Sequence, residues 1–263
     1  MKKTILITGS TDGIGLLTAK KLASAGHQIL LHGRSKTKLE NAAIEVGHSC
    51  ESYEADLSSI AEVQKLADAI KANHNKIDIL INNAGVFTIP YPITKDGYDA
   101  RIMVNTIAPY HLTKLLLPMM DENARVVNLS SVAQSTVTSS VFSKNARLSD
   151  SDAYAQSKLA LTMWSIELAS SLGENAPAII AVNPGSFLAS KMVKDAYGIA
   201  GNDLNLGADI LVRAATADEF ASASGRYFDN DSGRFANPHR DALIPEKNTQ
   251  VIHAIENVIS ELM

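Results

Sequence analysis

The sequence predicts one α/β domain with a mostly parallel, doubly wound sheet and helices on both of its faces. Short apolar runs rich in β-branched residues alternate with amphipathic helical stretches from end to end, as in strand–helix–strand units with right-handed crossovers. Glycine, amide, serine and proline residues follow four of the predicted strands, at the edge where such sheets bind ligands. The 263 residues, of which 46% are hydrophobic, suit a single domain spanning 1–263 better than two.

Each element is bounded by its own signals. Gly26 closes the first helix, Pro109 interrupts the fourth, and Asp152 is expected to cap the helix that follows a long polar loop. The predicted strands are 5–7, 28–31, 49–55, 77–81, 126–129, 178–182 and 226–228. The predicted helices are 16–23, 35–46, 59–72, 95–120, 152–172, 206–217 and 248–262. Loops near 86–98, 132–152 and 186–206 are expected to lie around the substrate.

Composition excludes several classes of function. A net charge of −4 without a dense Lys/Arg run gives no reason to expect nucleic acid. Cys50 is the only cysteine, which excludes an intramolecular disulfide, and the seven histidines lack ligand spacing, so no metal site is predicted. The apolar run behind Lys3 ends at Thr8 and no run approaches a membrane-spanning length, so we expect a cytoplasmic protein without a membrane partner.

A glycine-rich turn links the first predicted strand to the first helix. Gly9, Gly13 and Gly15 let the backbone turn tightly and approach a bound group closely. The helix that follows directs its unpaired N–H groups and the positive end of its dipole at this turn, which suits a pyrophosphate. The spacing differs from the G-x-G-x-x-G fingerprint, and a tight turn without a ligand is the alternative interpretation.

The end of the second strand bears on the choice of cofactor. No Asp or Glu lies between Gln28 and Lys38, whereas Arg34 stands where an arginine accommodates a 2′-phosphate. NADP(H) is therefore favoured over NAD(H). Lys36 and Lys38 are as well explained as the solvated start of a helix.

Two further strand ends carry candidate cofactor contacts. Asp56 and Leu57 could bond the adenine amine and cover its ring, and Asp56 could also cap the next helix. Asn83, Ala84 and Gly85 either leave space beside a ribose or stabilise the sheet, and the sequence does not separate these roles.

The chemistry is expected to lie with Tyr154 and Lys158, which are four residues apart and therefore share one helix face. A phenol has a pKa near 10, and a neighbouring ammonium lowers it toward the operating pH, which makes an acid/base pair. Ser131 would orient a reacting carbonyl or alcohol. Asn105 is either a satisfied structural amide or part of a polar relay that holds a water for Lys158.

Together these motifs resemble the short-chain dehydrogenase/reductase family, in order and with compatible spacing from residue 4 to about residue 190. The resemblance rests on TGSTDGIG at 8–15, NNAG at 82–85, Asn105, the serine pair ending at Ser131, YAQSK at 154–158 and NPG at 183–185. It implies a Rossmann-type fold and a tyrosine-based proton relay beside a nicotinamide. The implied catalytic residues are Tyr154 as general acid/base, Lys158 as its activator and a ribose ligand, Ser131 as the group that steadies the substrate, and Asn105 as the last member of the relay.

The resemblance also implies a set of cofactor contacts. These are Gly9, Ser10, Thr11, Asp12, Gly13, Ile14, Gly15, Arg34, Asp56, Leu57, Asn83, Ala84, Gly85, Tyr154, Lys158, Pro184 and Gly185. The backbone after Pro184 would meet the carboxamide. Where family members often carry Thr, this chain has Ala189 and then Ser190, so Ser190 is a weaker candidate.

Two features resemble the retinol dehydrogenase-like branch of the family. The interval between Ser131 and Tyr154 is long, and the residues 225–228, GRYF, are similar to a GKYF segment of that branch. Neither feature names a retinoid as the substrate.

The expected substrate is a small carbonyl compound or alcohol. A partly apolar molecule is suggested by loop residues that could equally cover the sheet, namely Phe87, Ile89, Tyr91, Val137, Phe142, Phe187, Leu188, Met192 and Tyr197. Apolar stripes on two helices are first of all core, and family resemblance adds that these helices commonly form the interface of a homodimer or homotetramer; the stripes are Leu112, Leu115 and Leu116, and Leu161, Trp164 and Leu168.

The sequence thus favours an NADP(H)-dependent oxidoreductase that transfers a hydride between a nicotinamide and a carbonyl or alcohol. A noncatalytic NADP(H)-binding redox sensor, and an epimerase or dehydratase on the same fold, remain as alternatives.

Overall fold

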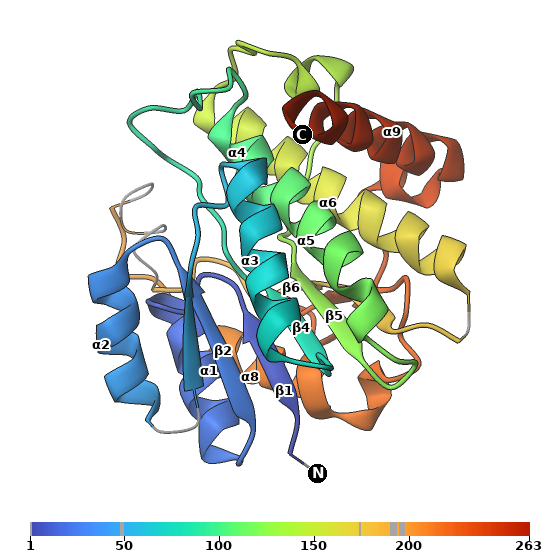
Figure 1. Ribbon diagram of the computed structural model, residues 1–263. Helices are drawn as coiled ribbons and strands as arrows, with labels where there is room; N and C mark the ends of the chain where they lie inside the picture. The colour runs from blue at the N-terminus through green and yellow to red at the C-terminus, as the bar shows by residue number, and fades with distance from the viewer. Residues whose placement is uncertain (1, 48–49, 174, 190–193, 195–197) are drawn as a thin grey trace.

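A single twisted sheet forms the centre of the molecule, shown as a ribbon in Figure 1. This computed structural model describes residues 2–47, 50–173, 175–189, 194 and 198–263. Within them the sheet has eight strands in the order β3-β2-β1-β4-β5-β6-β7-β8, all parallel except β8, which runs antiparallel to β7. The strands are β1 (Thr4–Ile7), β2 (Gln28–Gly33), β3 (Cys50–Glu54), β4 (Ile79–Asn82), β5 (Arg125–Leu129), β6 (Ala178–Asn183), β7 (Tyr227–Asp229) and β8 (Arg234–Ala236). The predicted Rossmann-type α/β fold is confirmed.

Helices cover both faces of this sheet. They are α1 (Gly13–Ser24), α2 (Lys36–Val46), α3 (Ile60–Asn73), α4 (Ala100–Ile102), α5 (Ala108–Leu116), α6 (Asp150–Leu172), α8 (Leu204–Thr216) and α9 (Pro245–Leu262). Helices α1, α2 and α8 pack on one face, and α3, α5 and α6 pack on the other, with α9 lying against α6 (Figure 1). No helix in the described part of the chain is long and apolar enough to cross a membrane.

The two apolar cores follow from the alternation of side chains along buried strands. In β1, Ile5 and Ile7 point into the core beneath α1 and α8, whereas Leu6 points into the core beneath α3, α5 and α6. All three side chains are fully buried, so a one-residue shift of the register would exchange the two cores.

The region predicted as one helix over 95–120 differs in detail. The chain first turns at Gly97, whose φ is +91°, and the helix begins at Ala100 with Asp99 accepting the N–H of Arg101. A π-helical segment, Met103–Ile107, then leads into α5. Pro109 lies in the first turn of α5, directly after this wider turn, and the helix continues through the break that was expected there.

The first residues of three further helices also differ from the prediction. Helix α6 begins at Asp150, because Ser149 rather than Asp152 is the N-cap and accepts the Asp152 N–H at 3.1 Å. Helix α8 begins at Leu204 and α9 at Pro245, each earlier than expected. Strand β8 was not predicted; it pairs with β7 through a turn in which Gly233 has a φ of +68°.

The apolar stripes of α5 and α6 are core in this chain. Leu161, Trp164 and Leu168 are at most 3% exposed, in the same apolar cluster as Val251 and Ile255 of α9. The stripe on α6 is therefore not an exposed surface for a second subunit, because it is buried in the chain's own core. A homo-oligomer stays a prediction, and the apolar stripe on α6 does not support it.

Candidate active site

A cavity of about 320 Å³ at the carboxyl edge of the sheet brings the sequence motifs together. It is lined by fifteen of the predicted residues: Gly9, Thr11, Asp12, Gly13, Ile14, Gly15, Arg34, Asp56, Leu57, Asn83, Ala84, Gly85, Tyr154, Lys158 and Pro184. Ser10, Gly185, Ser131 and Asn105 lie outside this lining. A larger cavity of about 630 Å³, between α6, the β7–β8 hairpin and the start of α9, contains none of the predicted site residues.

The glycine turn fits only glycine at two of its positions. Gly9 has a φ of +64°, and a Cβ placed on it would lie 2.9 Å from the Cα of Ala84. A Cβ on Gly15 would lie 2.4 Å from the carbonyl oxygen of Gly9. The loop thus leaves its backbone bare at the start of α1, where Asp12 accepts the N–H of Gly13 at 2.8 Å. Such a cradle is open to a pyrophosphate.

Asn83 shapes this loop from the neighbouring strand. Its Nδ2 donates to the carbonyl oxygens of Thr8 at 2.8 Å and Gly9 at 3.0 Å, and the N–H of Ala84 donates to the hydroxyl of Thr8 at 3.0 Å. The side chain therefore has the stabilising role that the sequence left open, while Asn83 also lines the cavity.

The charges near the second strand differ in how far they are neutralised. Arg34 is exposed, lines the cavity and makes no ion pair within the described residues. Lys38 lies 3.7 Å from Asp12, and neither Lys36 nor Lys38 lines the cavity. Arg34 is consequently the cation best placed for an anionic group in this cavity.

Asp56 lies in the turn before α3, whose N-cap is Ser59, and its contact with the adenine amine stays a prediction. Its Oδ1 accepts the N–H of Ser58 at 2.9 Å, its own N–H donates to Glu62 at 2.6 Å, and it lines the cavity beside Leu57. The carboxylate therefore shapes the turn into α3 and remains half-buried at the cavity wall.

Tyr154 and Lys158 lie on successive turns of α6 at the inner end of the cavity. The Nζ atom of Lys158 lies 5.6 Å from the centroid of the Tyr154 ring and donates to the carbonyl oxygen of Leu129 at 2.7 Å. Lys158 is 4% exposed, and burial lowers its pKa to about 8. The ring of Phe87 packs 4.8 Å from that of Tyr154, centroid to centroid. A buried cation thus lies beside a half-buried phenol ring.

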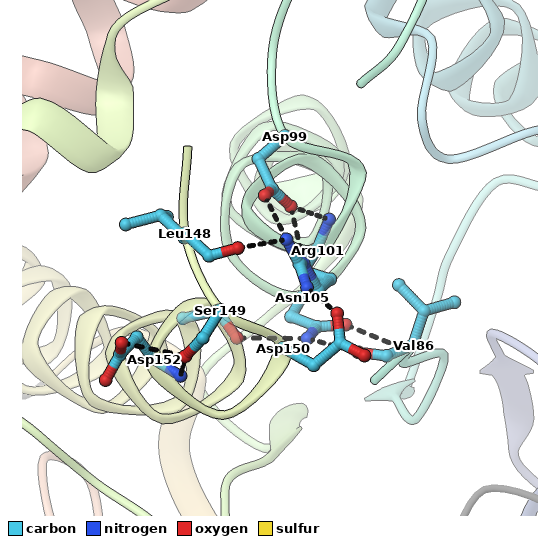
Figure 2. A network of polar contacts seen from close by, with 9 residues as sticks. Val86, Asp99, Arg101, Asn105, Leu148, Ser149, Asp150 and Asp152 are labelled. Carbon is cyan, nitrogen blue, oxygen red and sulfur yellow. Dashed lines mark hydrogen bonds and ion pairs between the residues drawn. The ribbon is translucent and has the colours of Figure 1, made fainter. Parts of the chain in front are cut away.

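Asn105 is a fully buried amide of the π-helical segment, shown in Figure 2. Its Oδ1 accepts the N–H of Val86 at 2.8 Å, and its Nδ2 donates to the carbonyl of Val86 at 2.9 Å and to the hydroxyl of Ser157 at 3.0 Å. Ser157 in turn donates to the carbonyl of Tyr154 at 2.7 Å. Asn105 is therefore a satisfied structural amide that ties the loop at 86 to the turn carrying Tyr154, and its part in a proton relay stays a prediction.

The start of α6 is held by a buried guanidinium. Arg101 is 1% exposed and binds Asp99 through Nε–Oδ1 at 2.9 Å and Nη2–Oδ2 at 2.6 Å. It also binds Asp150, the first residue of α6, and both contacts appear in Figure 2. The helix that carries Tyr154 is thereby fixed to α4.

Ser131 lies beside the cavity and Ser130 in its wall. The hydroxyl of Ser131 accepts the N–H of Ala133 at 3.1 Å, and its carbonyl accepts from the hydroxyl of Tyr227 at 3.2 Å. The hydroxyl of Ser130 contacts that of Thr162 at 2.6 Å. The substrate-orienting role of Ser131 therefore stays a prediction.

The apolar loop residues that were predicted near the substrate differ in exposure. Phe87, Phe142 and Leu188 are buried, whereas Tyr91 and Phe187 are exposed. Ser190, Met192 and Tyr197 lie outside the described residues. Within the described residues no group of three or more His, Cys, Asp or Glu side chains could hold a metal ion.

Seven residues of the cavity lining were not among the predicted site residues, and His32 is the only ionisable one of them. His32, in β2, is 3% exposed and lines the cavity between the glycine turn and Ala55. A single histidine in an apolar strand carries no local signal, because its partners come from other strands.

Known proteins resemble this chain in sequence and in fold. The model of the family described as short chain dehydrogenase matches residues 3–197. Human retinol dehydrogenase 13 is 32% identical over 251 residues, covering 86% of this chain and 76% of that protein. A crystal structure of a protein from Mycobacterium paratuberculosis, titled as putative and uncharacterized, has a TM-score of 0.83 at 28% identity, with 98% of this chain and 93% of that chain covered. The NADP active-site complex of RhlG from Pseudomonas aeruginosa has a TM-score of 0.72 at 25% identity, with 88% and 95% covered. The chain belongs to the short-chain dehydrogenase/reductase family, near its retinol dehydrogenase-like branch, and is an NAD(P)-dependent oxidoreductase.

Proposed function

We propose that the protein transfers a hydride between NADP(H) and a carbonyl or alcohol substrate, with Tyr154 as the general acid/base. The observation that carries this proposal is one cavity that joins the glycine turn, Arg34, Tyr154 and Lys158. The residues fit the cofactor, because side chains are excluded at Gly9 and Gly15 and the bare backbone of this turn lies at the start of a helix.

When bound, NADP(H) supplies or accepts the hydride. The phenol of Tyr154 gives a proton to the substrate oxygen, or takes one from it, at the same time. The ammonium of Lys158, held 5.6 Å from the phenol ring by the carbonyl of Leu129, favours the ionised form of that phenol. Ser131 would steady the substrate oxygen, and Asn105 would hold a water that links Lys158 to solvent.

The preference for NADP(H) is supported by the guanidinium of Arg34 in the cavity, which makes no ion pair among the described residues, and by relatives whose structures hold NADP, such as RhlG. Relatives named for retinol support an apolar alcohol or carbonyl substrate, and the phenyl ring of Phe87 beside Tyr154 agrees with this. A cytoplasmic location and a homodimer or homotetramer remain predictions.

Replacing the tyrosine tests the proposal. With a panel of ketones, aldehydes and quinones, Tyr154→Phe should lower NADPH turnover at least about 100-fold, because the proton donor is lost. The Kd for NADPH, measured by fluorescence titration, should stay unchanged. Tyr53→Phe, on a tyrosine of β3 that does not line the cavity, is the matched control and should keep full activity.

Each alternative predicts a different result. A fully active Tyr154→Phe variant refutes the assigned role of the tyrosine. If the wild-type protein binds NADPH but oxidises it with no substrate of the panel, the redox sensor is favoured. Conversion without stoichiometric consumption of cofactor indicates an epimerase or dehydratase.

A further inference from the structure

An imidazole ring lies between the two halves of the cofactor cavity. His32 is the last residue but one of β2, and its side chain sits between the glycine turn after β1 and the end of β3. It is 3% exposed and lines the cavity. No motif of the sequence assigns it a role.

Both nitrogens of the ring are engaged by backbone groups. Nδ1 lies 3.2 Å from the backbone nitrogen of Gly9, which can only donate, so Nδ1 accepts. Nε2 lies 3.1 Å from the carbonyl oxygen of Ala55, which can only accept, so Nε2 carries the proton. One neutral tautomer therefore satisfies both partners, and a protonated ring would set two N–H groups against each other at Gly9. Burial lowers the pKa of His32 to about 4, which keeps the ring neutral near pH 7.

The main chain of His32 holds the same loop. Its N–H donates to the hydroxyl of Ser10 at 2.9 Å, and its carbonyl accepts the N–H of Ser10 at 3.0 Å. Gly9 and Ser10 are thus bound to one residue of β2 by side chain and backbone. The N–H of Gly9 is occupied by the ring, which leaves the first N–H groups of α1, at Ile14 and Gly15, for an anion.

The two partners of the ring lie at two different subsites expected for the dinucleotide. Gly9 opens the turn expected at the pyrophosphate, whereas Ala55 directly precedes Asp56 and Leu57, which are expected at the adenine. The ring therefore fixes the separation of these two subsites before the cofactor arrives. Preorganisation of this kind raises affinity by removing the entropy lost on binding.

We propose that His32 is a positioning residue for NADP(H), whose neutral ring holds the glycine turn and the end of β3 at the spacing that the cofactor requires. This inference rests on the proposed function, because it assumes that NADP(H) binds in this cavity. It assigns His32 no contact with the reacting atoms.

The test separates affinity from chemistry. His32→Phe keeps a ring but loses both hydrogen bonds, so we expect the Kd and KM for NADPH to rise roughly tenfold while kcat at saturating NADPH changes less than about twofold. His32→Gln retains one acceptor and one donor and should restore most of the affinity. His111→Phe is the matched control, since His111 is also buried and its pKa is also lowered by burial, but it lines no part of this cavity.

A histidine that serves only stability would lower the melting temperature in His32→Phe without a change in the Kd for NADPH of the folded protein, and this result overturns the proposal. Should the phenylalanine variant not fold, His32→Gln is compared with His32→Asn, whose shorter amide cannot reach both partners; equal affinity of the two overturns it. Nitrogen-15 spectra of the wild-type ring must show a proton on Nε2 and none on Nδ1, and the opposite tautomer also overturns it. Failure of the wild-type protein to bind NADPH would instead refute the proposed function.

Discussion

At the scale of single residues, the site depends on groups whose surroundings change their chemistry. Lys158 is buried, and its ammonium donates to the carbonyl of Leu129 at the end of β5. The spacing of Tyr154 and Lys158 made this pair predictable, since residues four apart on a helix share a face. The burial that lowers the lysine pKa was not predictable, because it comes from strands distant in the sequence.

Lys158 is expected to lower the stability of the fold. Its pKa is about 8 in the folded chain against an ordinary 10.5, so between these values the unfolded chain binds more protons and stability rises with pH. Below pH 8 the buried ammonium costs up to about 3 kcal/mol. At pH 7, Lys158→Met should therefore raise the free energy of unfolding, measured in urea titrations, by about 1 to 3 kcal/mol. This range allows for the Leu129 carbonyl that the substitution leaves unpaired.

The same comparison at pH 10 provides the check. The advantage of Lys158→Met should shrink there, because the wild-type lysine is then neutral. Lys20→Met, in a surface pair with Glu45, is the control and should change stability by less than about 1 kcal/mol at either pH. A Lys158→Met variant that is less stable than the wild type at pH 7 contradicts the desolvation argument.

Arg34 should decide between the two cofactors. Arg34→Asp places a carboxylate where a 2′-phosphate would lie and where a ribose diol could instead be bound. We expect the ratio of kcat/KM for NADPH over NADH to fall at least about 100-fold, a change of roughly 3 kcal/mol. Lys36→Asp is the control with the same change of charge outside the cavity lining, and equal kinetics with both cofactors in the wild type would remove the claim.

At the scale of elements, two devices place the catalytic helix. The π-helical turn before Pro109 puts Asn105 beside Val86 and Ser157, and the guanidinium of Arg101 joins α4 to the first residue of α6. The sequence predicted a helix here and a disturbance near the proline, but not the π turn. A wider turn depends on which side chains fill the space beneath it, and that space is made by α6.

Removing the buried guanidinium should be costly. Arg101→Ala leaves Asp99, whose side chain is 0% exposed, as an unpaired buried charge. We expect the free energy of unfolding to fall by about 3 to 5 kcal/mol in urea titrations. Turnover should fall as well, because the start of α6 loses its bond to α4.

The surface pair of Arg213 and Glu219 offers the comparison. Its side chains are 43% and 42% exposed, so Arg213→Ala should change stability by no more than about 1 kcal/mol. Equal losses from Arg101→Ala and Arg213→Ala would show that the buried pair contributes no more than an exposed one.

At the scale of the whole molecule, the last helix, α9, covers part of α6, which could otherwise contact a second subunit. Helix α9 packs along α6, with Tyr110 donating to Glu256 at 2.7 Å and Tyr98 to Glu261 at 2.6 Å. A mostly parallel sheet with helices on both faces was predictable from the alternation of strands and helices, whereas the order of the strands in the sheet was not predicted. The position of α9 was not predictable either, because an amphipathic helix at the end of a chain shows which face it buries but not against which element.

A charge on the buried face of α9 should therefore release it and expose the α6 stripe. Ile255 is 0% exposed, and Ile255→Asp buries an unpaired carboxylate, so we expect the helix to detach and stability to fall by more than about 3 kcal/mol. Trp164 is the only tryptophan and is 0% exposed, so its emission should shift to longer wavelength and report this step alone. The uncovered stripe should make the variant self-associate in sedimentation experiments.

Asn257→Asp adds the same charge on the exposed face of α9 and should leave the tryptophan emission and the sedimentation coefficient unchanged. A buried Trp164 and an unaltered sedimentation coefficient in Ile255→Asp would show that α9 is not what covers this face.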